Sequence, residues 1–291
     1  PKHKGTDKLQ ADLKARLAKL RRQPRKKGAS RSASHMVPHE GAGQIALVGP
    51  PNSGKSSLVN ALTHASPQVA EYPFTTREPQ PGMMPHQDIA MQLIDMPPLS
   101  REHVDPWVYD LIRRADLLWL VVDCGNSLEG WELIQELLPP KRIVIYPAER
   151  DSPELADPGT VAKPALLVVT ACDKPECLPN VEALQELLDE EWPTLPTSTQ
   201  NGLGFDDLRR RSFQALHVIR IYTKQPGHPP DMKQPFTLPE GATIEDLTTK
   251  IHRELLGQLK FARIWGKSVF DGQRVQRDHV LEEGDVVELH V

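Results

Sequence analysis

The chain has few cysteines and no long apolar run. Only three cysteines occur among its 291 residues, Cys124, Cys172 and Cys177, which argues against a disulfide framework, and their spacing shows no metal-binding pairs. No 18 consecutive residues are apolar and no signal peptide is recognised, so a membrane partner is not expected. No internal repeat is found. These absences predict a cytoplasmic protein.

Charge is distributed unevenly along the chain. Residues 1–40 hold 12 Lys and Arg against 3 Asp and Glu, a net charge of +9, whereas the remaining 251 residues hold 23 against 36, a net charge of −13. A basic arm on an acidic body favours contact with nucleic acid or with an acidic partner. The alternative is that these cations only solvate an exposed helix.

The hydrophobic pattern divides the chain into three parts. Residues 1–40 are predicted to form a basic helix, with leucines spaced four, four and three apart over 6–22, followed by a linker. Residues 41–215 alternate short apolar runs with helical stretches, which predicts an α/β doubly wound, mostly parallel sheet. Residues 216–291 read β-β-α-β-β, a small α+β module whose helix is expected over Ile244–Leu256.

A complete phosphate-binding loop stands between a predicted strand, Gln44–Val48, and a predicted helix that begins after it. Its glycines allow a tight turn whose N–H groups point at phosphate oxygens, Lys55 can reach the β- and γ-phosphates, and the Ser56 hydroxyl can ligate Mg²⁺. The helix N-terminus adds partial positive charge. The predicted nucleotide-binding residues of this loop are Gly49, Pro50, Pro51, Asn52, Ser53, Gly54, Lys55, Ser56 and Ser57.

A GTP-binding protein needs further elements downstream, and the chain supplies them in order. Thr75 and Thr76, in the string Tyr72-Pro73-Phe74-Thr75-Thr76, offer the threonine expected at Mg²⁺ and the γ-phosphate. Asp95 follows a strand and is placed to hold Mg²⁺ through water. The glycine expected three residues after Asp95 is Pro98, which has no N–H and therefore cannot donate to the γ-phosphate.

The base-recognition element is expected after the strand that ends near Val169. Asp173 can accept hydrogen bonds from guanine N1–H and N2–H₂, which excludes adenine and disfavours an altered base preference. Ala171 cannot supply the lysine stem that covers the base, and Thr170 replaces asparagine only in part. Ser198 and Thr199, at the start of a polar turn, are expected where a backbone N–H meets guanine O6.

These strings resemble the Obg-type GTPases, and most closely the Drg (developmentally regulated GTP-binding) branch. The N-terminal helix is similar to that branch, and the strings Val218–Lys224, Lys250–His252 and Asp278–Val286 look like a TGS domain, a β-grasp module. The resemblance implies that Lys55 and Thr76 act in catalysis, and that Ser56, Thr76 and Asp95 hold Mg²⁺. Asn52 further implies stimulation by K⁺.

Departures from the family leave two functions open. Pro98 and Ala171 replace family residues, and the inserted domain after Asp95 is missing. Leu99 is not a departure, because the family likewise lacks a catalytic glutamine at this point. The first hypothesis is a slow Mg²⁺-dependent GTPase that acts on the ribosome or RNA through its basic arm and TGS domain. The second is a degenerate relative, a non-switching scaffold or RNA/protein interaction module that holds nucleotide, GTP or GDP, weakly or not at all, with little or no hydrolysis. The chain alone does not decide whether it is an enzyme.

Overall fold

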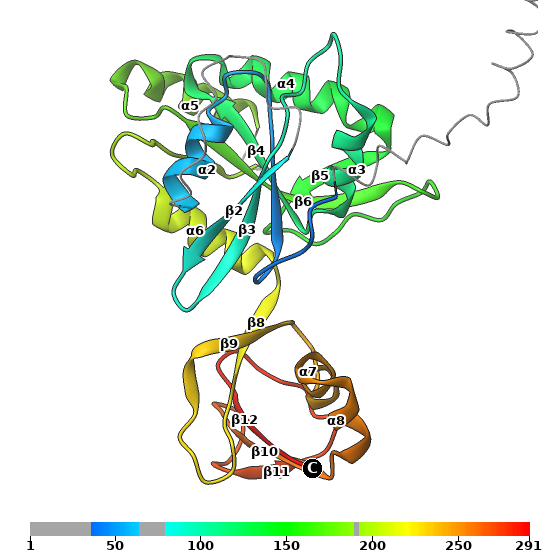
Figure 1. The fold of residues 1–291 in the computed structure, drawn as a ribbon. Coiled ribbons are helices and arrows are strands. Elements are labelled where there is room, and N and C mark those ends of the chain that lie inside the picture. Colours follow the sequence, from blue (N-terminus) through cyan, green and yellow to red (C-terminus); the bar gives the residue numbers. More distant parts are fainter. Residues whose placement is uncertain (1–35, 64–78, 189–191) are drawn as a thin grey trace, which may run out of the picture. The chain divides into compact units, whose positions relative to one another are not determined.

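The computed structural model describes residues 36–63, 79–188 and 192–291 (Figure 1). The expected N-terminal helix, most of the expected linker, and Thr75 and Thr76 lie outside these residues. Among the described helices, none combines the length and the apolarity needed to cross a membrane.

A seven-stranded, mostly parallel sheet forms the first half of the described chain (Figure 1). Its order is β2-β3-β1-β4-β6-β5, with the short β7 also paired to β6, and only the β2–β3 pair is antiparallel. The strands are β1 Gln44–Val48, β2 Gln80–His86, β3 Ile89–Asp95, β4 Leu117–Asp123, β5 Ile143–Pro147, β6 Val161–Thr170 and β7 Thr194–Pro196.

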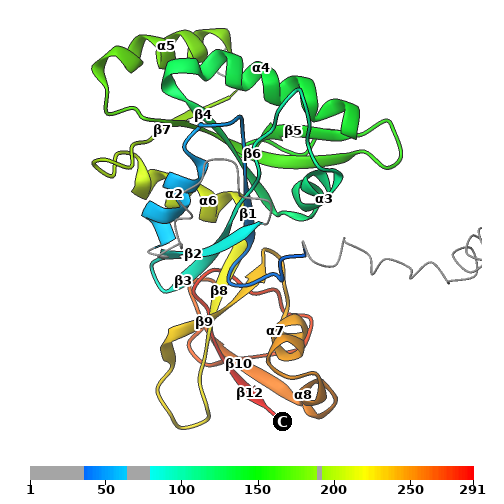
Figure 2. The ribbon, with the colours of Figure 1, turned by 45° about the horizontal axis from the view of Figure 1, so that its top comes forward.

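Helices cover both faces of this sheet (Figure 2). They are α2 Lys55–Thr63, α3 Pro106–Arg114, α4 Ser127–Leu137, α5 Leu178–Leu187 and α6 Phe205–Ala215, with short 3-10 turns at Cys124–Asn126, Pro139–Lys141 and Pro175–Cys177. The central strand β1 is buried along its whole length: Ala46 and Val48 pack on the side of α3, α4 and α5, while Ile45 and Leu47 pack on the side of α2 and α6. Continuous burial on both faces is what makes its sequence uniformly apolar. The α/β doubly wound prediction is thereby confirmed.

The sheet contains two strands that the hydrophobic pattern did not predict, the short β7 and the longer β2. Strand β2 includes Pro81, Gly82 and Pro85, residues that weaken a strand, yet it pairs with β3 over seven residues. It lies at the edge of the sheet, where a residue without an N–H is tolerated because no neighbour needs its donor.

A second, five-stranded sheet follows, in the order β11-β10-β12-β8-β9. Its strands are β8 Val218–Thr223, β9 Asp231–Pro239, β10 Phe261–Trp265, β11 Gln273–Val275 and β12 Val286–His290. The pair β12–β8 is parallel and the others are antiparallel. One face of the sheet packs on α7, Ile244–Ile251, through Ile244 and Leu247.

The single helix expected over Ile244–Leu256 is wrong, because two helices occupy this region. Helix α7 ends at Ile251, His252 is extended (φ −165°), and α8 spans Arg253–Gln258. The His252 ring accepts a hydrogen bond from the Glu254 N–H at 3.4 Å. Because the His252 side chain caps the first turn of α8, a new helix begins there. The apolar spacing that predicted one helix therefore continues across the break between α7 and α8.

Candidate functional site

The phosphate-binding loop joins β1 to α2 in a conformation that two glycines permit. A Cβ at Gly49 would lie 2.1 Å from the Val121 carbonyl oxygen, so this position has no room for a side chain. Gly54 has a φ of +85°, a region that glycine enters without strain, and Asn52 is also left-handed at +60°. These features keep the loop backbone close to the ends of the central strands.

Lys55 is buried at the centre of the loop. Its Nζ donates to the carbonyl oxygens of Gly49 (3.1 Å) and Pro50 (2.7 Å), and it lies 3.3 Å from Ser53 Oγ. Only 6% of the residue is exposed. Burial lowers the pKa of Lys55 from 10.5 to about 8, although the nearby Asp95 carboxylate acts in the opposite direction. The loop therefore holds a cation that lacks an anion to match its burial.

Ser56 and Asp95 meet at the mouth of the loop. The Ser56 hydroxyl donates to Asp95 Oδ2 at 2.5 Å, while Asp95 Oδ1 is buried and has no hydrogen-bond partner among the described residues. Burial raises the pKa of Asp95, and the hydrogen bond from Ser56 only partly opposes this effect. A buried carboxylate oxygen without a partner, beside a serine hydroxyl, fits an oxygen-ligand cation such as Mg²⁺.

Within the part of the chain that the structure describes, no three His, Cys, Asp or Glu side chains are grouped to hold a metal ion by themselves. This agrees with the chemistry of Mg²⁺, which uses one or two protein groups together with substrate phosphates and water. Ser56 and Asp95 would hold the ion, and when bound it would neutralise charge on the phosphate oxygens.

Changing Asp95 to asparagine tests this metal site. We expect the gain in GTP affinity on adding Mg²⁺ to fall about 10- to 100-fold, because groups that support a metal typically contribute that much to its affinity. The measurement is a GTP titration at stepped Mg²⁺ concentrations. Asp116→Asn is the matched control, since its carboxylate accepts from the Gln44 N–H at 2.7 Å, at the start of β1 and therefore at the opposite end of that strand from the loop. An Asp95→Asn variant with unaltered Mg²⁺ dependence would exclude the site.

The segment after Asp95 lies against the loop. The Leu99 N–H donates to the Gly49 carbonyl oxygen at 3.0 Å, Leu99 is buried, and Pro98 points outward and is exposed. Residues 50–53 and 99–102 line a cavity of about 550 Å³, together with residues of α4. The segment thus contacts the loop through the N–H of Leu99, the residue after Pro98.

The base-recognition residues gather at the end of β6. Asp173 is exposed, and its Oδ1 accepts a hydrogen bond from the buried Ser198 hydroxyl at 2.6 Å, which lowers the pKa of Asp173. Thr170 does more than its residue type suggested: its hydroxyl donates to the Ser53 carbonyl at 2.9 Å, so it ties this segment to the phosphate loop. The backbone of Ala171 is left-handed (φ +59°), a conformation that is strained for alanine.

The structure therefore brings most of the predicted residues together at the carboxyl ends of β1, β3 and β6 and at the turn after β7. This is the edge of a doubly wound sheet where ligands bind. Ser57 and Thr199 are exposed. Thr76 lies outside the described residues.

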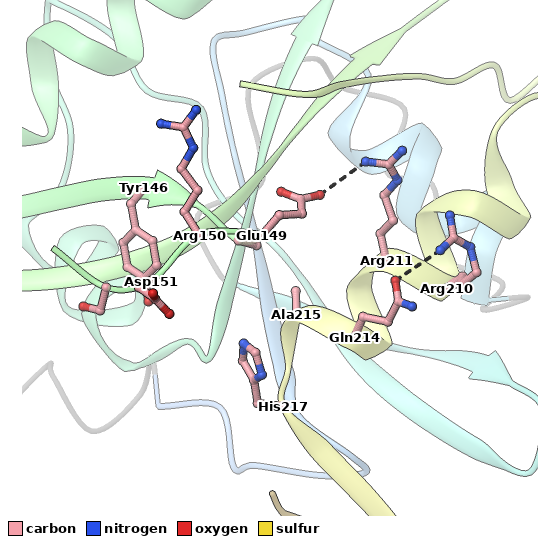
Figure 3. Close-up of a pocket in the computed structure, with 11 residues that line it drawn as sticks. Tyr146, Glu149, Arg150, Asp151, Arg210, Arg211, Gln214, Ala215 and His217 are labelled. Atoms are coloured by element: carbon pink, nitrogen blue, oxygen red, sulfur yellow. Dashed lines mark hydrogen bonds and ion pairs between the residues drawn. The ribbon is translucent and has the colours of Figure 1, made fainter. Parts of the chain in front are cut away.

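A second hollow, of about 480 Å³, lies elsewhere in the same domain (Figure 3). Figure 3 shows arginines and carboxylates facing one another in it: Arg211 pairs with Glu149 at 3.3 Å, and Arg210 donates to Gln214 at 3.2 Å. None of the predicted nucleotide-binding residues lines this hollow. Arg211 and Glu149 pair inside the hollow, whereas Arg210 and His217 pair with Asp207 and Glu240, which do not line it.

Comparison with known families gives two matches. Residues 44–147 match the family described as "50S ribosome-binding GTPase", and residues 219–291 match the TGS domain. The G domain of the T. maritima FeoB iron transporter is similar at 28% identity with a TM-score of 0.42, covering 59% of this chain and 97% of that chain. The chain therefore contains a P-loop GTPase domain followed by a TGS domain.

Relatives with the same organisation define the type more closely. An uncharacterized GTP-binding protein of Methanocaldococcus jannaschii is 28% identical over 99% of this chain and 88% of its own length. Developmentally-regulated GTP-binding protein 1 of Xenopus laevis is 29% identical over 95% of this chain and 91% of its own length. This chain is therefore similar, over nearly its whole length, to GTP-binding proteins of the Drg type. The alignment with the Methanocaldococcus jannaschii protein spans 349 positions, 58 more than the 291 residues of this chain. That relative therefore has segments with no counterpart in this chain.

Proposed function

We propose that this protein is a slow, Mg²⁺-dependent GTPase whose nucleotide site is formed by residues 49–57, Thr76, Asp95, Asp173, Ser198 and Thr199. The observation that carries the proposal is the pair of unmatched buried charges at the loop. Lys55 is buried and forms no ion pair with any described residue, so the nearby Asp95 carboxylate only partly compensates its charge, and Asp95 Oδ1 has no hydrogen-bond partner in the described part of the chain. A nucleotide triphosphate with Mg²⁺ satisfies both at once.

In this site the protein would act by position and charge. Lys55 would hold the β- and γ-phosphates, the Gly54 and Lys55 N–H groups at the start of α2 would face phosphate oxygens, and Thr76 would complete the site from the neighbouring segment. Because Leu99 stands where some GTPases have glutamine, no side chain at that position orients water, and hydrolysis is expected to be slow. Asn52 supports a further proposal, stimulation by K⁺.

A specific observation favours the alternative, a scaffold that binds nucleotide without switching. Pro98 cannot donate to a γ-phosphate, and Leu99 N–H is already bonded to the loop at Gly49. A site that does not sense the γ-phosphate binds GDP and GTP alike. Either form is proposed to be cytoplasmic and to contact the ribosome or RNA through its basic arm and TGS domain.

Calorimetric titration with GTP, GDP and ATP separates these functions. A GTPase that switches is expected to bind guanine nucleotides, to bind ATP far more weakly, and to change the protease sensitivity of residues 72–105 between GDP and a GTP analogue. Equal affinities with unchanged sensitivity support the scaffold. Absence of guanine-nucleotide binding at millimolar concentration would exclude the GTPase.

Changing Asp173 to asparagine tests the base contact. The carboxylate accepts from two guanine donors, and a hydrogen bond to a charged group contributes about 1.5–3 kcal/mol, so GTP affinity should fall at least about 100-fold. An amide presents one donor and one acceptor, which suits xanthine because its O2 replaces the guanine amino group. Asp173→Asn should therefore bind XTP better than GTP. Unchanged GTP affinity, or a loss without rescue by XTP, would contradict this role.

A further inference from the structure

The five-stranded sheet has two chemically different faces. On β10, Ala262 and Ile264 point into the core that α7 completes, and Val287 of the paired strand β12 joins them. The alternate residues of β10, Phe261, Arg263 and Trp265, are on the opposite face and are exposed or half-buried. We call this side the open face.

Two arginines on the open face stand directly opposite each other. Arg263 of β10 pairs in register with Arg274 of β11, and both are exposed. Neither forms an ion pair with any residue in the described ranges. Like charges directly across an antiparallel pair destabilise a sheet, so the arrangement is better suited to a state in which an anion lies between them.

The open face also carries a stack of flat side chains that crosses three strands. The rings of Phe261 and His290 stack at 4.4 Å with an interplanar angle of 12°, and the Arg274 guanidinium lies 4.0 Å from the Phe261 ring centre. Because β11 and β12 flank β10 on opposite sides, Arg274 and His290 approach Phe261 from opposite sides. Further along, Lys224 lies 4.1 Å from the Trp265 ring centre.

The acidic side chain of this face does not balance the two arginines. Glu288 is buried and forms ion pairs with Lys224 at 3.2 Å and with His290 at 2.6 Å. Burial alone would raise the pKa of Glu288, but the hydrogen bonds from His290 and Lys224 outweigh it and lower the pKa. Glu288 also lies opposite Arg263 in the register of β10 and β12, but its ion pairs are with Lys224 and His290, so Arg263 and Arg274 remain without an ion-pair partner among the described residues. Arg220, at the other end, is paired with Glu283 at 2.6 Å.

We propose that the open face of this sheet binds single-stranded RNA, with a phosphate between Arg263 and Arg274 and an unpaired base on the outer plane of Arg274. The inference rests on the proposed RNA contact and assigns it to named residues. Bases of unpaired strands stack on aromatic rings and on arginine planes, while phosphates meet the cations. An acidic peptide would use the charges but not the flat stack.

The test is the affinity of the full-length protein for a fluorescein-labelled 12-nucleotide single-stranded RNA, measured by anisotropy at several salt concentrations. The double variant Arg263→Glu/Arg274→Glu is expected to lower affinity at least about tenfold and to reduce the salt slope by about 1 to 2, the effect of losing two phosphate contacts. Arg253→Glu, an exposed arginine on α8, is the matched control and is expected to leave both unchanged.

A conservative variant separates stacking from charge. Arg274→Lys keeps the charge and loses the planar group, so RNA binding should weaken while binding of a labelled poly-glutamate peptide should not. RNA carrying 4-thiouridine is expected to cross-link to the peptide that contains Gln273–Val275. The inference is overturned by an unchanged affinity in the double variant, an equal loss in Arg253→Glu, cross-links confined to residues 1–35, or poly-glutamate binding that equals RNA binding.

The outcome is independent of the nucleotide site. GTP titration of the same variants is expected to match the unsubstituted protein. If that protein bound no guanine nucleotide but still bound RNA through Arg263 and Arg274, the proposed GTPase function would fail and the RNA-binding face would stand. Circular dichroism confirms that each variant is folded before its affinity is compared.

Discussion

Replacing Lys55 by methionine is expected to abolish nucleotide binding and at the same time to stabilise the nucleotide-free protein. Two charged hydrogen bonds to phosphates contribute about 1.5–3 kcal/mol each, so GTP affinity should fall at least about 100-fold. Methionine has a similar length and needs no hydration, so it suits the buried position. The same change therefore moves function and stability in opposite directions.

The sign of the stability change follows from the pKa of Lys55. The unfolded chain holds the ordinary value of 10.5 and the folded chain about 8, so the folded state disfavours the charged form. The difference corresponds to roughly 3 kcal/mol below pH 8, a cost that fades as pH rises from about 8 to 10.5. Nζ also makes three hydrogen bonds that methionine loses, worth about 0.5 kcal/mol or more each, so we expect a net gain of at most about 1.5 kcal/mol at pH 7.

The pH dependence of binding has the same origin. A bound phosphate favours the charged lysine, so GTP binding above pH 8 takes up a proton and GTP affinity should fall as pH rises. Urea unfolding at pH 7 and pH 10, together with nucleotide titrations over this range, measures both effects.

Lys163→Met is the control for the Lys55 variant. Burial also lowers the pKa of Lys163, and its Nζ donates to the Ala115 carbonyl at 2.7 Å, but it lies near the start of β6 rather than at the loop. Its replacement should leave GTP affinity unchanged. A Lys55→Met variant that binds GTP normally, or that is less stable than the unsubstituted protein at pH 7, would contradict the assignment.

Changing Pro98 to glycine is expected to raise GTP turnover by about 100-fold. A single backbone donor aimed at charge that develops in the transition state is worth about 2.7–4 kcal/mol, or 100- to 1,000-fold in rate. Proline at this position has removed that donor. Phosphate release under single-turnover conditions measures the change, while GDP affinity should hardly move because GDP has no γ-phosphate.

The neighbouring residue offers a matched control for this prediction. Pro97→Gly introduces the same backbone freedom without adding a donor at position 98, and each change to glycine should lower stability by roughly 0.4–1 kcal/mol or more. Turnover that rises in Pro98→Gly and stays low in Pro97→Gly supports a missing donor. Equal rates in the two variants would point to flexibility, and unchanged rates in both would favour the non-switching scaffold.

Local sequence was a reliable guide where one short segment makes the whole feature. The phosphate loop needs glycines at fixed offsets, a lysine and a serine, and these are neighbours in the chain, so residues 49–56 could be predicted without tertiary information. The buried strands were also predicted, because burial on both faces produces continuous apolar runs. Strand β2 and the break at His252 could not be, since one depends on lying at a sheet edge and the other on a local cap.

The site beyond the loop depends on distances that only folding creates. Asp95 was expected near Mg²⁺, but its bond to Ser56 and its unpartnered oxygen arise because β1 and β3 are adjacent in the sheet. Thr170 was regarded as a partial replacement for asparagine. Its bond to Ser53 spans 117 positions of sequence, and no local pattern encodes such a contact.

The sequence by itself determined the class of protein, because the phosphate loop, the ordered strings after it and the strand–helix alternation are each formed by residues that are close together in the chain. Only the tertiary structure decided how the charges are matched. It buried Lys55 where Asp95 only partly compensates its charge, placed Leu99 against Gly49, and set Arg263 opposite Arg274. The physical reason is that burial and pairing depend on residues that are close in space, whereas the sequence shows only which residues are adjacent along the chain.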